Sequence, residues 1–350
     1  MLFEMLYRRL LILTEGSLGI FESKTGSSVM RYRPQDCVAV LDSVNAGKPL
    51  GDFIPGLPDL PIVASVADTL PLQPDALLIG IAPTGGGLPD RMRRHLLDAL
   101  KAGLSIISGL HVMLRDDPEL AELAEANNAK LHDVRDAGQI RHIARGRARY
   151  TRAKRVLTIG IDCDVGKMVT ALELRKEAVR QGLNAAFVAT GQTGIMIEGW
   201  GIAIDHVISD FTAGATELLV EHVADKDMCF VEGQGSIEHP GYSAVTLGLL
   251  HGSCPDAMVI VCRPDRLLHN DWPDCPVAPI RQQIAINEAL LAPLHPGKVV
   301  AVAVNTARMT AEDAEAAVRK IAGDAGLPAA DPVRHGCKDL IAAIRRQVGI

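Results

Sequence analysis

The sequence has few aromatic residues, no closely spaced cysteine pair and no long apolar run. Aromatic residues make up 3% of the 350 residues, which leaves few rings for stacking on bases. The seven cysteines include no C-x-x-C pair, so a reduced interior fits them better than a disulfide framework or a zinc site. No apolar run approaches the roughly 18 residues that span a bilayer. The net charge of −6 also disfavours nucleic acid as a partner. We therefore expect a cytoplasmic protein that binds neither nucleic acid nor membranes.

The stretch that organises the chain is residues 160–168, which read G-I-D-C-D-V-G-K-M. The β-branched apolar run at 156–159 predicts a buried strand before it, and a periodic apolar stretch predicts a helix after it. Strand, glycine-rich turn, Gly-Lys and helix together predict a phosphate-binding loop. Backbone N–H groups and the helix N-terminus would cradle phosphate oxygens, and Lys167 would supply a charge. The structural alternative is a strand-to-helix turn in which Lys167 is merely solvated.

This loop departs from the common form G-x-x-x-x-G-K-[ST]. Met168 stands where that form has a hydroxyl residue, and the hydroxyl normally holds the Mg²⁺ that bridges nucleotide phosphates. Thr170 is close in sequence but points to another face of the predicted helix. We therefore expect a loop that holds phosphates but is poorly equipped for Mg·ATP chemistry, and we expect no metal.

Strands and helices alternate along most of the chain, which predicts parallel, doubly wound sheets. The length suffices for two cores. We predict two α/β domains, a Rossmann/flavodoxin-like domain at 1–145 and a P-loop NTPase-like domain at 146–350. The boundary falls in a basic run that is either a solvated linker or a source of charge for an anionic ligand: Arg141, Arg145, Arg147, Arg149, Arg152, Lys154 and Arg155.

The predicted strands end in clusters of glycine and polar residues. In the first half these clusters are residues 83–87 and 108–111, and in the second half they include 190–194 and 232–236. Ligands of doubly wound sheets bind beyond the carboxyl ends of the strands, so we expect a composite site along that edge.

Four motifs carry a family resemblance: residues 82–86 (A-P-T-G-G), residues 162–170, residues 189–194 (A-T-G-Q-T-G) and residues 231–236 (V-E-G-Q-G-S). The phosphate loop with the downstream V-E-G motif resembles dethiobiotin synthetase-like P-loop proteins. The whole chain resembles the two-domain family of D-glutamate N-acetyltransferases, long catalogued as a domain of unknown function.

That resemblance implies transfer of an acetyl group from acetyl-CoA to the amine of D-glutamate. The loop would hold the phosphates of CoA, and because none of them is hydrolysed, Met168 would be no handicap. The implied CoA-binding residues are Asp162, Cys163, Asp164, Val165, Gly166, Lys167 and Met168, with Asn305 as an adenine contact suggested by P-loop relatives.

The acceptor amine is protonated at neutral pH, so a general base would help the reaction. The candidates are Glu232, His239 and Asp210. Glu232 ends a buried-looking strand, where burial would raise its affinity for a proton. In ATP-using relatives an acidic residue at this place would bind metal, which is the rival role.

The carboxylates of glutamate require cationic or backbone donors, and the oxyanion of the transition state requires N–H groups. Arg263 and Arg281 are the candidates to contact the carboxylates, and the alternative for each is an ion pair on the surface. The remaining predicted substrate-binding residues lie in the two glycine-rich loops and are Gly191, Gln192, Thr193, Gly194 and Gln234.

Three alternatives stay open. Cys163 in the loop permits a covalent acetyl-cysteine route, because a helix N-terminus favours the thiolate. A second hypothesis is that the protein is an ATP/Mg²⁺-dependent ligase or kinase acting on a small carboxylate. A third is a non-catalytic nucleotide-binding regulator. The many apolar helices permit self-association, and we expect a homo-oligomer.

Overall fold

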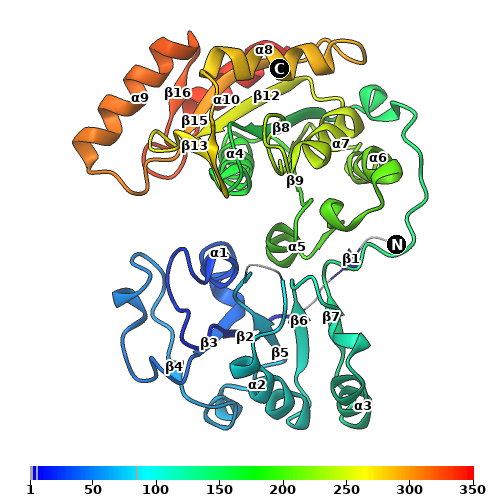
Figure 1. Ribbon diagram of the computed structural model, residues 1–350, viewed down its shortest axis with the longest axis vertical. Coiled ribbons are helices and arrows are strands. Elements are labelled where there is room, and N and C mark those ends of the chain that lie inside the picture. The colour runs from blue at the N-terminus through cyan, green and yellow to red at the C-terminus, as the bar shows by residue number, and fades with distance from the viewer. Residues whose placement is uncertain (1–2, 5–6, 84–85) are drawn as a thin grey trace. The chain divides into compact units, whose positions relative to one another are not determined.

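The computed structural model describes residues 3–4, 7–83 and 86–350, and it divides into two compact units (Figure 1). The first unit runs to Gly138 and also includes Ile195–Ala203. The second comprises Gln139–Gly194 and Ile204–Ile350. The sequence placed the boundary at 145/146 and gave no sign that residues 195–203 join the first unit. Thr84 and Gly85 of the predicted cluster at 83–87 lie outside the described residues.

The first unit is built on a six-stranded parallel sheet in the order β4–β3–β2–β5–β6–β7. Numbered along the chain from β2, this is the order 3-2-1-4-5-6 of Rossmann-like folds. The strands are β2 (Leu10–Leu13), β3 (Cys37–Leu41), β4 (Ile62–Val63), β5 (Ala76–Ile79), β6 (Ser105–Ser108) and β7 (Leu131–Asp133), and the helices are α1 (Lys24–Tyr32), α2 (Asp90–Lys101) and α3 (Pro118–Ala126).

Helices cover both faces of this sheet, with α2 and α3 on one side and α1 on the other (Figure 1). Successive strand residues point to opposite faces, and Leu11 and Leu13 belong to the cluster that packs beneath α2 and α3. On the other face Gly26 brings α1 close to the sheet. A Cβ at Gly26 would lie 2.8 Å from Ile12 Cγ2 and 3.2 Å from Gly80 Cα. Only glycine permits this approach, which is why the start of α1 looks like a turn in the sequence.

The second unit holds a six-stranded parallel sheet in the order β16–β15–β12–β8–β11–β9, with β8 near its centre. Its strands are β8 (Lys154–Gly160), β9 (Ala185–Val188), β11 (Met228–Val231), β12 (Ala257–Cys262), β15 (Lys298–Val304) and β16 (Ala329–Ala330). Its helices are α4 (Lys167–Arg180), α6 (Thr212–His222), α7 (Ser243–Ser253), α8 (Ile280–Leu291), α9 (Ala311–Ala325) and α10 (Lys338–Val348). With the usual right-handed crossovers, α4 and α10 lie on one face of this sheet, and these two helices touch each other. The helices α6 to α9 lie on the other face. There α6 touches α7, α7 touches α8, and α8 touches α9, which also contacts β15.

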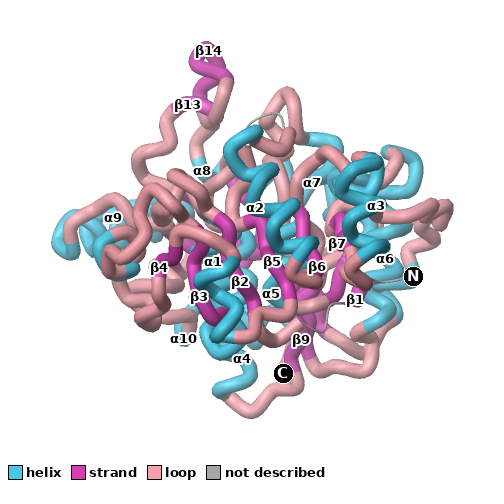
Figure 2. The backbone as a smooth tube through the Cα atoms, turned by 90° about the horizontal axis from the view of Figure 1, so that it is seen from below, coloured by secondary structure: helices cyan, strands magenta, loops and turns pink. Residues whose placement is uncertain are grey.

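An antiparallel hairpin of β13 (Leu268–His269) and β14 (Trp272–Pro276) connects β12 to α8. Figure 2 shows it standing clear of the helices of its unit, and Leu267, Leu268 and Trp272 on it are exposed. In the first unit β1 (Phe3–Glu4) pairs antiparallel with β10 (Trp200–Gly201). Short 3-10 turns lie at Pro34–Asp36, Leu50–Asp52, Ala67–Leu72, Leu114–Asp116, Arg147–Tyr150, Ile204–His206 and Ser209–Phe211.

The predicted fold class is confirmed, because both units are α/β with a parallel main sheet. The elements that were not predicted are α1, the hairpin, the two-residue strands β1, β10 and β16, and α5 (Gln192–Glu198). Within the described ranges, no helix is long and apolar enough to span a membrane.

Candidate active site

The loop that joins β8 to α4 has the backbone of an anion site. The strand ends at Gly160 and the helix begins at Lys167. Between them Asp164 has a φ of +55° and Gly166 a φ of +108°. Two left-handed residues so close together make a tight turn, and it leads directly into the positive end of α4, as in loops that bind anions.

Lys167 is folded back over this loop. Its Nζ donates to the main-chain carbonyl of Asp162 at 2.7 Å, and its side chain is 6% exposed. The aliphatic stem passes between two glycines, since a Cβ at Gly160 or Gly233 would lie 3.0 or 3.2 Å from Lys167 Cδ. The ammonium group is therefore fixed on the loop whose N–H groups would bind a phosphate.

Asn305, at the end of β15, supports the loop from the neighbouring strand end. Its Nδ2 donates to the carbonyl of Val165 at 3.0 Å, and its Oδ1 accepts from the N–H of Ala307 at 3.1 Å. The amide is thus committed to positioning the loop. Met168 is buried in the first turn of α4 and brings no oxygen to the site.

Glu232 follows β11, the strand next to β8, and its carboxylate is bound by the backbone of another strand end. Oε2 accepts from the N–H groups of Thr190 and Gly191, both at 3.0 Å. Gly194 is equally close, because a Cβ there would lie 2.3 Å from the same oxygen. Gln234 Nε2 donates to the carbonyl of Thr190 at 2.6 Å. The structure thus brings together Glu232, Gln234 and the predicted loop at 190–194.

A single residue fixes this arrangement against the phosphate loop. The N–H of Gly233 donates to Thr158 Oγ1 on β8 at 3.0 Å. A Cβ at Gly233 would lie 1.6 Å from the main-chain oxygen of Thr158, so no other residue fits this position. Glycine here is a requirement of close backbone approach.

Asp162 is fully buried and is bound by residues that the sequence reading did not connect to it. Its Oδ1 lies 3.1 Å from Nδ1 of His269, and its Oδ2 accepts from the N–H of Asn270 at 2.8 Å. Arg266 Nη1 lies 3.4 Å from Oδ2. These partners belong to the β13–β14 hairpin and the segment before it. The hairpin turns at Asn270 and Asp271, with Asp271 at a φ of +62°, and its first strand is too short for a periodic pattern in the sequence.

His239 links the loop after β11 to the same hairpin. Its Nδ1 accepts from the N–H of Gly241 at 3.1 Å, so its Nε2 must donate to the carbonyl of Asn270, 3.0 Å away. Both ring nitrogens of the neutral imidazole are therefore engaged. The ring also stacks against Tyr242 with centroids 4.8 Å apart. In this arrangement His239 joins segments of the site and has no lone pair free to take a proton.

Comparison with known families places this architecture. The family "Domain of unknown function (DUF1611_C) P-loop domain" matches residues 142–341, and "Domain of unknown function (DUF1611_N) Rossmann-like domain" matches residues 43–137. The chain belongs to the DUF1611 family.

Relatives of this DUF1611 protein include two proteins named D-glutamate N-acetyltransferase. The protein from Tritonibacter scottomollicae is 41% identical over 269 residues, which cover 77% of this chain and 80% of that one. The protein from Pseudoalteromonas sp is 37% identical over 284 residues, covering 79% of this chain and 83% of that one. A crystal structure of a DUF1611 family protein from Anabaena variabilis is similar with a TM-score of 0.91 and 38% identity, over 97% of this chain and 99% of that one.

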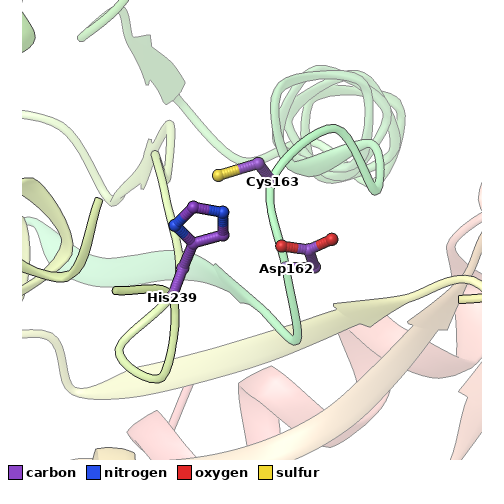
Figure 3. Close-up of side chains that lie close together, drawn as sticks. All are labelled: Asp162, Cys163 and His239. Carbon is purple, nitrogen blue, oxygen red and sulfur yellow. The ribbon is translucent and has the colours of Figure 1, made fainter. Parts of the chain in front are cut away.

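Three potential metal-ligating side chains of the DUF1611 protein converge near the loop. Figure 3 shows Asp162 and Cys163 facing the ring of His239, and their donor atoms lie within 4.8 Å of one another. Both Asp162 oxygens and both His239 nitrogens already have protein partners. Burial raises the pKa of the Cys163 thiol to about 11, although Lys167 opposes that rise. This donor set therefore fits a cation poorly, because each ligand would first have to leave its partner or lose a proton.

The other predicted site residues make no hydrogen bond or ion pair with this cluster among the contacts of the described residues. Asp210 is exposed in the 3-10 turn Ser209–Phe211. Arg281, at the start of α8, donates through Nε to the carbonyl of Asp324 at 2.6 Å. Arg263 follows β12 at the carboxyl edge of the sheet and is 9% exposed. Its Nη2 forms an ion pair with Oδ2 of Asp265 at 2.6 Å.

The basic run at 141–155 is used inside the second unit. Arg155 is buried and its Nη2 lies 2.6 Å from Asp256 Oδ1. Arg147 Nε lies 3.5 Å from Oε1 of the fully buried Glu217. These charges form ion pairs with acidic residues far away in the sequence, so they hold the unit together and are not gathered for a ligand.

Proposed function

We propose that this DUF1611 protein transfers the acetyl group of acetyl-CoA to the α-amine of D-glutamate. The observation that carries the proposal is the identity of 41% and 37%, over more than three quarters of the chain, to two proteins named D-glutamate N-acetyltransferase. A phosphate-type loop in which Met168 replaces the Mg²⁺-holding hydroxyl supports it, because CoA brings phosphates that are bound but never cleaved.

In this proposal the loop at 162–168 holds phosphates of CoA. Its N–H groups, the positive end of α4 and the ammonium of Lys167 supply the positive charge. Asn305 contributes by fixing the loop through the carbonyl of Val165 at 3.0 Å.

Glu232 is our candidate for the base. Its carboxylate is buried and held in position at the strand end by two backbone N–H groups, which accept no proton themselves. The α-ammonium of D-glutamate gives one proton to Glu232, and the freed nitrogen bonds to the thioester carbonyl carbon. The C–S bond then breaks, the sulfur of CoA takes the second nitrogen proton, and Glu232 returns its proton to solvent. The N–H groups of Gly191 and Gly233 are already engaged, so those of residues 192–194 and 234–236 are the candidate oxyanion donors.

The test is release of free CoA thiol from acetyl-CoA with D-glutamate, with L-glutamate and without acceptor, each in the presence of EDTA. Release that depends on D-glutamate and survives EDTA supports the proposal. No release with any amino acid would refute it, and ATP turnover with Mg²⁺ would then favour the ligase or kinase alternative.

Lys167→Ala tests the role of the loop in the same assay. We expect the KM for acetyl-CoA to rise about 10- to 100-fold, the range for one lost hydrogen bond to a charged group. Lys176→Ala is the matched control, because Lys176 lies on the same helix with a side chain 73% exposed. Equal behaviour of the two variants would show that the loop does not hold CoA phosphates.

A further inference from the structure

His269 carries a buried ring nitrogen that no described residue satisfies. The residue is 3% exposed, and within the described part of the chain its Nε2 has no hydrogen-bond partner. Buried polar atoms nearly always have a partner, so an orphaned one in a ligand-binding region indicates a missing ligand group.

The other ring nitrogen shows how His269 is prepared. Its Nδ1 lies 3.1 Å from Oδ1 of the fully buried Asp162. Because that carboxylate is an acceptor, Nδ1 carries the proton of this contact, and Nε2 is left for a ligand. In the imidazolium form of the ring, Nε2 donates to an anion.

The position of Asp162 identifies that anion by chemical class. Asp162 lies in the phosphate loop, and Lys167 Nζ donates to its main-chain oxygen at 2.7 Å. His269 and Lys167 therefore both contact this one residue. A phosphate held by the loop and Lys167 would be the nearest ligand to His269.

We propose that His269 is a phosphate ligand of the loop, donating from Nε2 to a phosphate oxygen while Asp162 holds Nδ1. The naming of CoA as the source of that phosphate rests on the proposed function. The alternative role, a base for acetyl transfer, fits less well. The pantetheine arm separates the thioester from the phosphates of CoA, so a residue beside the phosphates is not beside the reacting carbon.

Opening of the β13–β14 hairpin would let a phosphate reach His269. The hairpin consists of strands of two and five residues joined by a turn at Asn270 and Asp271, and Leu267, Leu268 and Trp272 on it are exposed. A two-stranded ribbon of this size has little stability of its own. In the proposal it opens to admit the phosphate and closes with Nε2 on it.

The charged and titratable groups that face His269 come from three segments. Asp162 and Cys163 lie on the loop, and Arg266 lies before the hairpin with Nη1 3.4 Å from Asp162 Oδ2. His239, from the loop after β11, has its ring centroid 5.5 Å from that of His269. His239 has both ring nitrogens engaged, so among these groups His269 is the imidazole with a nitrogen left for a phosphate oxygen.

The experiment is calorimetric titration of the full-length protein with CoA at about pH 6 and about pH 8, in buffers of different ionisation enthalpy. The wild type should bind more tightly at the lower pH and take up a proton. His269→Asn keeps a donor toward Asp162 but loses Nε2. It should bind CoA about 10- to 100-fold more weakly at pH 6, without the pH dependence or the proton uptake. His269→Gln reaches the Nε2 position and should recover part of the affinity.

Two comparisons separate this role from others. The acetyl-transfer defect of His269→Asn should vanish when the donor is S-acetylpantetheine, which has no phosphate. A base or a purely structural residue would impair both donors equally, and that result would overturn the inference. His295→Gln is the control, because His295 forms another His–Asp contact in the same unit, 2.9 Å from Asp256. It should leave CoA affinity unchanged.

The outcome also separates the inference from the proposed function. If the wild type turns over and His269→Asn binds CoA as tightly as the wild type, the inference is refuted and the proposed function stands. If the wild type binds no CoA, pyrophosphate is titrated instead. Binding that is lost in His269→Asn would keep the phosphate role and discard CoA, and no binding would end both.

Discussion

Replacement of Gly233 by Ala tests how the site is held together. A Cβ at this position would lie 1.6 Å from the main-chain oxygen of Thr158, whereas real contacts are essentially never under 3.0 Å. The loop after β11 must therefore move by about 1.4 Å (3.0 − 1.6), because the obstacle is backbone and cannot rotate away. This shift also breaks the bond from the Gly233 N–H to Thr158 Oγ1. We expect a loss of about 1–3 kcal/mol of stability, the usual range for overpacking.

The effect on catalysis should be larger than the effect on folding. Glu232 is adjacent to the displaced residue, and a misplacement of about 1 Å commonly costs about 100-fold in rate. The readouts are CoA thiol release and amide hydrogen exchange in β8 and β11, since a chain of two units need not unfold in one step. Gly323→Ala in α9 is the control, because a Cβ there has nothing within 4 Å. It should stabilise the helix by about 0.5–1 kcal/mol. If Gly233→Ala matched this control in both readouts, the described contact between the two loops would be wrong.

Two further substitutions address charge and nucleophilicity. Glu217 is fully buried; burial acts to raise its pKa, but hydrogen bonds from His142 and from the N–H groups of Arg145 and Arg147 bring the pKa below its ordinary value. Glu217→Gln should cost about 1.5–3 kcal/mol at pH 7. A carboxyl group whose pKa is lowered in the folded state stabilises the protein above its unfolded pKa of 4.5, and this stabilisation is lost as the pH falls below that value. In urea unfolding at several pH values, the difference in unfolding free energy between wild type and Glu217→Gln should therefore shrink below pH 4.5. A difference that grew there would contradict the assignment. Cys163→Ala should keep full turnover, because burial raises the thiol pKa to about 11 and the nucleophilic thiolate is scarce at neutral pH; an acetylated wild-type Cys163 found by mass spectrometry would refute this.

Much of the fold could be predicted because its signals are local. Apolar runs alternating with periodic helices predicted the strands of both main sheets except the two-residue β16, and the turn at 160–168 predicted the loop between β8 and α4. The start of α1 was hidden for a physical reason. Gly26 is required where the helix meets Ile12 and Gly80, and this composition is also typical of a turn.

The contacts within the site could not be predicted, because they join residues far apart in the chain. The sequence indicated Glu232 and the loop at 190–194 separately, and the structure joins them through the carboxylate. Nothing local connects Asp162 with His269, which lies 107 positions later. Likewise the basic run gave no sign that Glu217 and Asp256 would meet its charges.

The phosphate loop shows how one sequence departure and one structural contact lead to the same inference. Met168 removes the hydroxyl that would hold Mg²⁺, and the carboxylate of Asp162 is occupied by the hairpin. Neither residue is then free to bind a cation beside the phosphates. The phosphate charge must be met by Lys167, by backbone N–H groups and, in our proposal, by His269. Ligand binding should consequently depend on pH and ionic strength, and only weakly on added Mg²⁺.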